Sequence, residues 1–303
     1  MVDPRKLFSF IDLDFEVPLG LNLLAGLSGF TDAGNTLSQV SDHILENLDA
    51  KLIVQFDNDE LLDYRSRRPV MYFEKDHIES YQPAVLGIYL VEDETGQQFL
   101  WLNGYEPDMK WEAFTRSLVQ IVDILGISSV TWVHSIPFPV PHTRAIGVTV
   151  SGNRKDLIDS YSEWKPQTQV PGNVLHLLEY RLSAEGVPVA GFVLLVPHYL
   201  ADSEFPQAAV AALEHLASAT GLVFPTDTLR DEGVEFVARL EEQLTSNEEL
   251  RRLIETLEAG FDKTGPSSTP IRRPARKVPT ADEIASELED YLANREKNQG
   301  DKN

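Results

Sequence analysis

The sequence predicts an α/β fold with three layers, in which helices cover both faces of a mostly parallel sheet. Short, continuously apolar runs suit strands that are buried on both faces, and they alternate with segments of helical periodicity as far as about residue 222. The chain has 303 residues, of which 42% are hydrophobic and 24% charged. A chain of this length and composition can bury a substantial core.

The first predicted unit is a strand, a helix and a second strand. Residues 21–30 are a short apolar run interrupted by glycine and serine. Along residues 36–48 apolar side chains recur every three or four positions, which predicts a helix that Thr31 or Asp32 can cap. Residues 51–57 are the second strand. This order predicts a right-handed crossover between parallel strands.

The middle of the chain mixes strands and helices. Residues 84–104 predict a hairpin, because two apolar runs flank the turn residues 93–96. The other predicted strands are short apolar or β-branched runs, and they cover residues 69–74, 128–136, 145–152 and 187–200. Helical periodicity predicts helices over residues 111–125, 172–186 and 206–220.

The last third has a different composition. Residues 228–262 hold no strand candidate and predict two helices that part near Ser246 and Asn247, either of which can cap the second helix. Acidic residues outnumber basic ones ten to three between 231 and 262. The predicted division is therefore an α/β domain over 1–225, an acidic helical extension over 226–262, and a Pro/Ser-rich linker with one short helix near 281–295 in 263–303, largely disordered.

Charge and residue usage exclude several classes of function. The chain has 26 Lys+Arg and 48 Asp+Glu, a formal net charge of −22, which disfavours binding to nucleic acid or to anionic lipid. It has no cysteine, so disulfides and thiol chemistry are absent, and its seven histidines show no metal-ligand spacing. We expect no metal or cofactor. No signal peptide or spanning segment is recognised, which predicts a cytoplasmic protein.

Polar residues gather where the predicted strands end. In open α/β sheets ligands bind at the carboxyl ends of the strands, so these residues define a candidate ligand pocket. Its members are Ser28, Gly29, Thr31, Asp32, Gly34, Asn103, His134 and Ser151. The alternative is structural: the glycines permit a tight turn, and Asp32 caps the helix that follows. The cap explains the residue types more simply, and no residues are assigned to catalysis.

A stiff segment with three alternating prolines precedes His142 and Arg144. It holds both side chains rigidly, which suits an interface or the wall of a pocket. In so acidic a protein, Arg144 is expected to pair with a carboxylate rather than with a phosphate.

Three segments together resemble one family. They are LAGLSGFTDAGNTLSQVSDHIL, PFPVPHTRAIGVTVSGNRKDLI and GFVLLVPHYLADSEFPQAAVAALEHL, and in this order they look like the PAC2 family (proteasome assembly chaperone 2-like), in its actinobacterial branch. The matching motif residues are His142, Arg144, His198 and Tyr199. The resemblance implies a phosphorylase/hydrolase-like domain, oligomers, and no established reaction for bacterial members.

Two departures from the family pattern stand out. Phe30 occupies a position where the family often has Trp, which leaves the glycine-rich motif intact. Family chaperones that dock on proteasome rings end in a hydrophobic residue, Tyr and one further residue, whereas this sequence ends in Asp-Lys-Asn. We therefore do not expect docking on a proteasome through the terminus.

The leading hypothesis is a non-enzymatic, chaperone-like interaction or assembly protein that self-associates. The expected partners are further copies, with a trimer as the expected number, and a second protein. Residue types that favour interfaces occur in or beside predicted loops, at Tyr64, Arg65, Arg67, Arg68, Tyr105 and Trp111. The alternative is a small-molecule-binding protein or enzyme that uses the strand-end crevice. Proteasome assembly is a third hypothesis, and it depends on the family resemblance alone.

Overall fold

An eight-stranded sheet forms the centre of the protein. A computed structural model describes residues 6–12, 15–165 and 167–264. The strands lie in the order β1-β3-β6-β7-β2-β8-β10-β9. Their bounds are β1 Phe8–Phe10, β2 Asn22–Ser28, β3 Ala50–Phe56, β6 Gly87–Glu92, β7 Gln98–Tyr105, β8 Ser129–Phe138, β9 Gly147–Gly152 and β10 Val189–Pro197.

The sheet is mixed rather than mostly parallel. Strands β7, β2, β8 and β10 run parallel to one another in its centre. The remaining pairs, β1·β3, β3·β6, β6·β7 and β10·β9, are antiparallel. The predicted hairpin over 84–104 is confirmed, but it inserts between β2 and β3, which the sequence placed side by side. Apolar runs reveal burial on both faces but not the direction of a neighbour, so the antiparallel pairs outside this hairpin were not foreseen.

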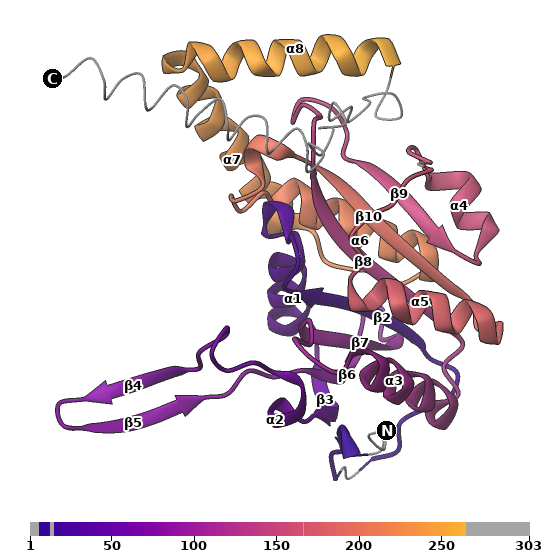
Figure 1. Cartoon of the computed structure of the whole chain (residues 1–303). Coiled ribbons are helices and arrows are strands. Elements are labelled where there is room, and N and C mark those ends of the chain that lie inside the picture. Colours follow the sequence, from indigo (N-terminus) through magenta and orange to yellow (C-terminus); the bar gives the residue numbers. More distant parts are fainter. Residues whose placement is uncertain (1–5, 13–14, 166, 265–303) are drawn as a thin grey trace, which may run out of the picture. The chain divides into compact units, whose positions relative to one another are not determined.

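Helices cover both faces of the sheet (Figure 1). On one face α1 and α6 pack together, and on the other α3 packs against α5. Each face has its own apolar core, one built on α3 and α5 and one on α1 and α6. The helices that precede the carboxyl-terminal pair are α1 Thr36–Asn47, α2 Asn58–Leu61, α3 Trp111–Leu125, α4 Lys155–Tyr161, α5 Val174–Glu185 and α6 Pro206–Thr220. The three-layer arrangement follows, while α4 was not predicted.

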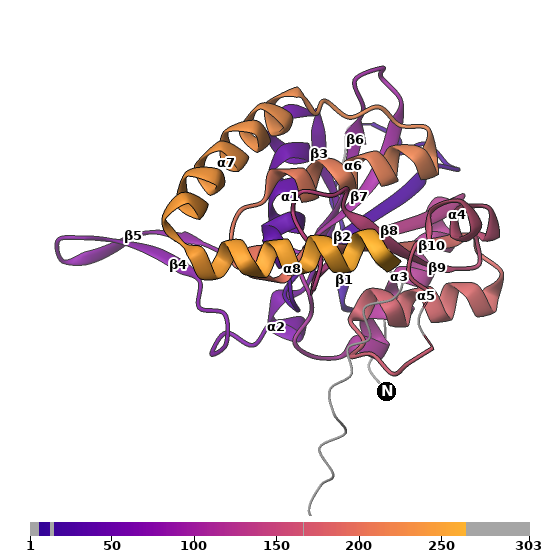
Figure 2. The ribbon, with the colours of Figure 1, turned by 90° about the horizontal axis from the view of Figure 1, so that it is seen from above.

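Two carboxyl-terminal helices extend the α/β body. Helices α7 (Asp227–Ser246) and α8 (Glu248–Thr264) confirm the predicted pair, and the Asn247 side chain accepts a hydrogen bond from the Leu250 N–H at 3.0 Å. Helix α7 packs on α6, and α8 continues from it at an angle (Figure 2). The predicted linker and the helix near 281–295 lie outside the described residues.

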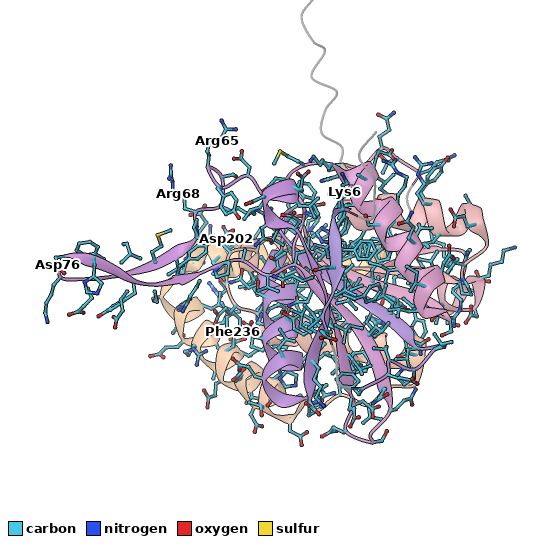
Figure 3. All side chains as sticks on the ribbon, turned by 90° about the horizontal axis from the view of Figure 1, so that it is seen from below. Lys6, Arg65, Arg68, Asp76, Asp202 and Phe236 are labelled. Atoms are coloured by element: carbon cyan, nitrogen blue, oxygen red, sulfur yellow. The ribbon has the colours of Figure 1, made fainter. Side chains whose placement is uncertain are left out.

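A two-stranded hairpin projects from the body between β3 and β6. Its strands are β4 (Val70–Glu74) and β5 (His77–Gln82), and they form a separate sheet. The tip, near Asp76, lies well away from the eight-stranded sheet (Figures 1 and 3). The sequence predicted β4 but not β5, because β5 carries polar and charged residues among its apolar ones. We call this hairpin, residues 70–82, the arm.

No helix among the described ranges is long and apolar enough to cross a bilayer.

We predict that Gly191→Ala destabilises the fold by about 3 kcal/mol, as expected for overpacking of a filled core. Gly191 lies beside Trp132 in the β10·β8 register, and a Cβ there would lie 2.1 Å from Trp132 Cε2. Gly172→Ala is the matched control, because its Cβ would meet nothing within 4 Å. Urea unfolding measures both, and an equal free energy of unfolding in the two variants would contradict this packing.

Candidate functional site

The carboxyl ends of the central strands meet at one edge of the sheet, which we call the carboxyl edge. Ser28 ends β2, Tyr105 ends β7, Phe138 ends β8 and Pro197 ends β10. Strand β9 runs in the opposite direction, so its carboxyl end lies at the other edge. Ser151 on β9 pairs with Gly191, near the beginning of β10. The structure therefore places Ser151 away from the candidate pocket.

The loop after β2 is fastened to the loop before α6. The Gly34 N–H donates to the Ala201 carbonyl at 2.8 Å, and the Gly34 carbonyl accepts the Phe205 N–H at 3.0 Å. Gly34 has φ +72°, and a Cβ there would lie 3.2 Å from Phe205 Cβ and from Val196 Cγ1. Glycine is therefore required for close packing of two chain segments. A tight turn that packs closely is the structural role expected for the glycines of this segment.

Asp32 caps α1 rather than facing an open pocket. Its Oδ1 accepts the Leu37 N–H at 2.7 Å, and its Oδ2 accepts the Ser38 N–H at 3.0 Å and the Ser38 hydroxyl at 2.9 Å. Both N–H groups belong to the first turn of α1, where no carbonyl of the helix can bond them. Ser135 Oγ also donates to Oδ1, at 3.3 Å. The carboxylate is thus fully engaged by its own chain.

His134 lies on the opposite face of the sheet from Ser135 and Asp32. Its ring is buried, stacks on Phe30 with centroids 6.3 Å apart, and lies 3.4 Å from Thr31 Oγ1 through Nε2. Burial, with a smaller contribution from His176, lowers the pKa of His134 to about 4. The imidazole is therefore neutral at physiological pH.

The space beside His134 is filled. It is enclosed by side chains from β2, β8 and α5 and from the segments that follow β2 and β7, and it has no room for a molecule the size of water. Its lining residues are Leu27, Phe30, Glu106, His134, Asn173, Val174 and Leu175. Of the eight residues predicted to form one pocket, His134 alone lines it.

The other predicted pocket residues are distributed around the edge. Ser28 donates through Oγ to the Gly104 carbonyl at 3.3 Å. Gly29 approaches β7 closely, since a Cβ there would lie 3.0 Å from Glu106 Cβ and from Arg67 Nη2. Asn103 alternates with the buried Leu102 and so shares the α1 face of the sheet, opposite His134. The eight residues do not converge on one cavity.

Glu106, which the sequence analysis did not select, is a buried carboxyl group at the carboxyl edge. It follows β7 and accepts the Val174 N–H in the first turn of α5 at 2.7 Å. Burial raises the pKa of Glu106, against the opposing effect of the Val174 hydrogen bond. No local motif marks a residue that caps a helix 68 positions away, so the sequence offered no signal for it.

Ser151 belongs to a buried hydrogen-bond cluster beneath α5. Ser151 Oγ donates to Glu179 Oε2 at 2.7 Å, and Trp132 Nε1 donates to the same oxygen at 3.0 Å. His176 packs edge-on against Trp132, with centroids 4.8 Å apart. Burial raises the pKa of Glu179, while the two hydrogen bonds oppose the rise. The cluster ties α5 to β8 and β9.

The four family-motif residues lie where the body meets the carboxyl-terminal helices. Tyr199 Oη accepts the His142 backbone N–H at 2.7 Å and lies 2.7 Å from His142 Nδ1. Arg144 forms a bidentate ion pair with Asp262 on α8, at 2.9 and 2.8 Å. The expected carboxylate partner of Arg144 is thereby confirmed. His198 is exposed and packs edge-on against Tyr199.

The residues proposed as interface anchors divide into two groups. Tyr105 is buried and donates to Asn58 Oδ1 at 2.7 Å, Arg67 pairs with Asp108 at 3.2 Å, and Trp111 donates to the Pro107 carbonyl. Arg65 and Arg68, by contrast, are exposed near the base of the arm (Figure 3). Among the described residues, no group of three or more His, Asp or Glu side chains is arranged to hold a metal ion.

The most exposed apolar surface belongs to the arm. Met71 pairs with Tyr81 and Phe73 pairs with Ile78, so all four side chains lie on one face. They are between 47% and 61% exposed. A register shift between Tyr72 and Phe73 places Ile78 rather than Glu79 opposite Phe73. The candidate functional site is therefore a surface, which we call the apolar arm face.

The fold and this surface define a three-layer α/β protein with an apolar arm and two carboxyl-terminal helices. Residues 26–244 match the model of the PAC2 family. The chain belongs to the PAC2 family. No curated protein sequence matches it significantly.

Solved structures agree with this assignment. A protein of unknown function from Corynebacterium glutamicum is 32% identical, with a TM-score of 0.80 over 85% of this chain and 97% of its own. The Mycobacterium tuberculosis protein of unknown function Rv2714 is 35% identical, with a TM-score of 0.80 over 85% of this chain and 91% of its own. Both organisms are actinobacteria. The Mycobacterium tuberculosis proteasome-assembly chaperone homologue Rv2125 shares the fold at 21% identity, with a TM-score of 0.70 over 77% of this chain and 100% of its own.

We predict that Asp32→Ala lowers the free energy of unfolding by about 2 kcal/mol, the upper end of the range for losing a helix cap. Asp32→Asn, which keeps one acceptor oxygen, should lose about half as much. Urea unfolding at pH 7 measures both variants. Unchanged stability in Asp32→Ala would mean that the carboxylate is not the cap of α1.

We also predict that Glu179 makes stability depend on pH. Because its folded-state pKa is raised, its contribution is fully present below the unfolded-state pKa and is lost as the pH rises through the folded value. Relative to Glu179→Gln, wild type should lose free energy of unfolding as the pH rises above the ordinary glutamate value of 4.5, by up to about 1.4 kcal/mol per unit of pKa shift. The exposed Glu185 on the same helix supplies the control, Glu185→Gln. Identical pH profiles for wild type and Glu179→Gln would contradict the burial of this carboxyl group.

Proposed function

We propose that the protein is a non-enzymatic, self-associating interaction or assembly protein, and that the arm binds a second copy of the chain. The observation that carries this proposal is the apolar arm face. Met71, Phe73, Ile78 and Tyr81 contribute no packing to the core and remain about half exposed. Contiguous exposed apolar residues of this kind typically mark interfaces.

The stability of the arm also favours a partner. A lone two-stranded hairpin is marginally stable in water, and a third strand or a packing surface is needed to hold it. The arm projects from the body, so its own subunit does not supply that surface (Figures 1 and 2). A second copy of the chain would supply one, to an extent that grows with the protein concentration.

The distribution of charge also favours a second copy of the chain as the partner of the arm. Arg65 and Arg68 at the base of the arm are exposed in a chain of net charge −22, and Arg65 also pairs with Asp63 at 3.2 Å. Between 231 and 262 acidic residues exceed basic ones by seven. Another copy therefore offers acidic surface to the base of the arm, which favours encounter between copies.

Fold relatives point toward assembly. Rv2125 is described as a proteasome-assembly chaperone homologue, and the fold is shared. The likeness to phosphorylase and hydrolase architecture, by contrast, is an analogy at the level of fold and implies no reaction. The small-molecule alternative has less support, since the predicted pocket residues are engaged by caps and close packing.

We predict that Met71→Asp with Phe73→Asp weakens self-association at least about 100-fold, because two carboxylates replace two central apolar contacts. Light scattering coupled to gel filtration measures the mass, and the wild type should give a multiple of 34.0 kDa, with three copies expected. Val234→Asp adds one charge at an exposed apolar position on α7 and serves as the control. A wild type that is monomeric at micromolar concentration, or a double variant that assembles normally, would contradict the proposal.

A further inference from the structure

Three consecutive residues after β8 hold the carboxyl-terminal helices to the body. The His142 ring faces Glu241 on α7, with Nε2 and Oε1 3.9 Å apart. Thr143 Oγ1 donates to Glu258 Oε1, and Arg144 pairs with Asp262, both on α8. Each of the three residues thus faces or binds a different acidic side chain of α7 or α8. We call His142, Thr143 and Arg144 the latch.

The His142 side chain is almost completely buried, at 2% exposure. Tyr199 Oη already accepts the His142 backbone N–H, and it has a single proton to donate. Tyr199 Oη can give that proton to Nδ1, 2.7 Å away, which leaves the ring's own proton on Nε2. Nε2 has no hydrogen-bond partner in the described residues. The arrangement therefore suits a neutral imidazole.

A second proton on the ring would disturb this arrangement. The proton would occupy Nδ1, so Tyr199 Oη would have to accept two hydrogen bonds and lose the one it donates. Burial of the charge would add to the cost, because His142 loses its water when α7 and α8 are docked.

The surrounding acidic groups do not compensate for that cost. Arg144 already neutralises Asp262 and lies 3.5 Å from Glu258, which also accepts from Thr143. Glu241 is the remaining carboxylate that faces His142, and it is 60% exposed and screened by solvent. The other neighbour of the ring, Tyr199, carries no charge, and His198 packs edge-on against Tyr199. Burial accordingly lowers the pKa of His142 despite Glu241 and Glu258.

We propose that His142 couples the docking of α7 and α8 to pH: the helices stay docked while its imidazole is neutral and detach more often once it is protonated. Docking is fully favoured above the pKa of a free histidine, near 6.5, and it weakens as the pH falls through the lower docked value. For each pH unit that separates the pKa of a free histidine from the pKa of docked His142, the detached population grows up to about tenfold. Detachment would uncover Phe138, Val140 and Leu195, against which Phe261 of α8 packs.

Hydrogen exchange of the full chain at pH 7.5 and pH 5.5 tests this proposal, with rates corrected for intrinsic exchange. We expect amides of residues 250–262 to lose protection several-fold at pH 5.5, while those of β2 and β8 do not. His142→Gln is neutral at both pH values and should show no such loss. His198→Gln, which changes the exposed histidine beside Tyr199, is the matched control and should behave as wild type.

If the His142→Gln variant folds poorly, a second measurement, made on the wild type, still tests the proposal. Titration of the His142 ring by NMR in wild type should give a pKa below that of a free histidine, near 6.5. Equal loss of α8 protection in wild type and His142→Gln, no loss in wild type, or a His142 pKa above 6.5 would each overturn the proposal.

Discussion

Burial of both faces of strands β7, β2, β8 and β10 dictates where the other elements lie. These strands are almost continuously apolar, so each face needs its own layer of helices, and the structure has two apolar cores rather than one. The antiparallel strands β3, β6 and β9 extend the sheet from this buried centre. The arm lies outside both cores and has no such cover.

The same constraint explains why the carboxyl edge is occupied by the chain itself. The loop after β2 must return across the edge to begin α1, and Gly34 and Asp32 fasten it there. Helix α8 then lies against the end of β8 through Phe261 and the latch. The strand ends meet as they do at the ligand crevice of other open α/β sheets, but the space beside His134 is filled by side chains. Exposed apolar surface remains on the arm, which is why we propose an interaction with another chain rather than chemistry at this edge.

Much of the fold was predictable because the signals are local. Helix α3 follows directly from its periodic apolar face, and the β6–β7 hairpin from its turn residues. The cap by Asp32 and the pairing of Arg144 with a carboxylate were foreseen from residue type and charge. Neighbour relations were not, because strand direction depends on the sheet as a whole. Ser151 was assigned to the wrong edge for this reason, and Glu106 was missed because its partner lies on a distant helix. Only the first strand of the arm, β4, was predicted, since β5 owes its structure to pairing with β4 rather than to its own residues.

Hydrogen exchange of the arm as a function of protein concentration tests self-association through this surface most directly. If the arm binds a second copy, amides of residues 70–82 are protected at high concentration and exchange rapidly on dilution, while amides of β2 keep one rate throughout. Arm amides that exchange at the same rate at every concentration would contradict the account.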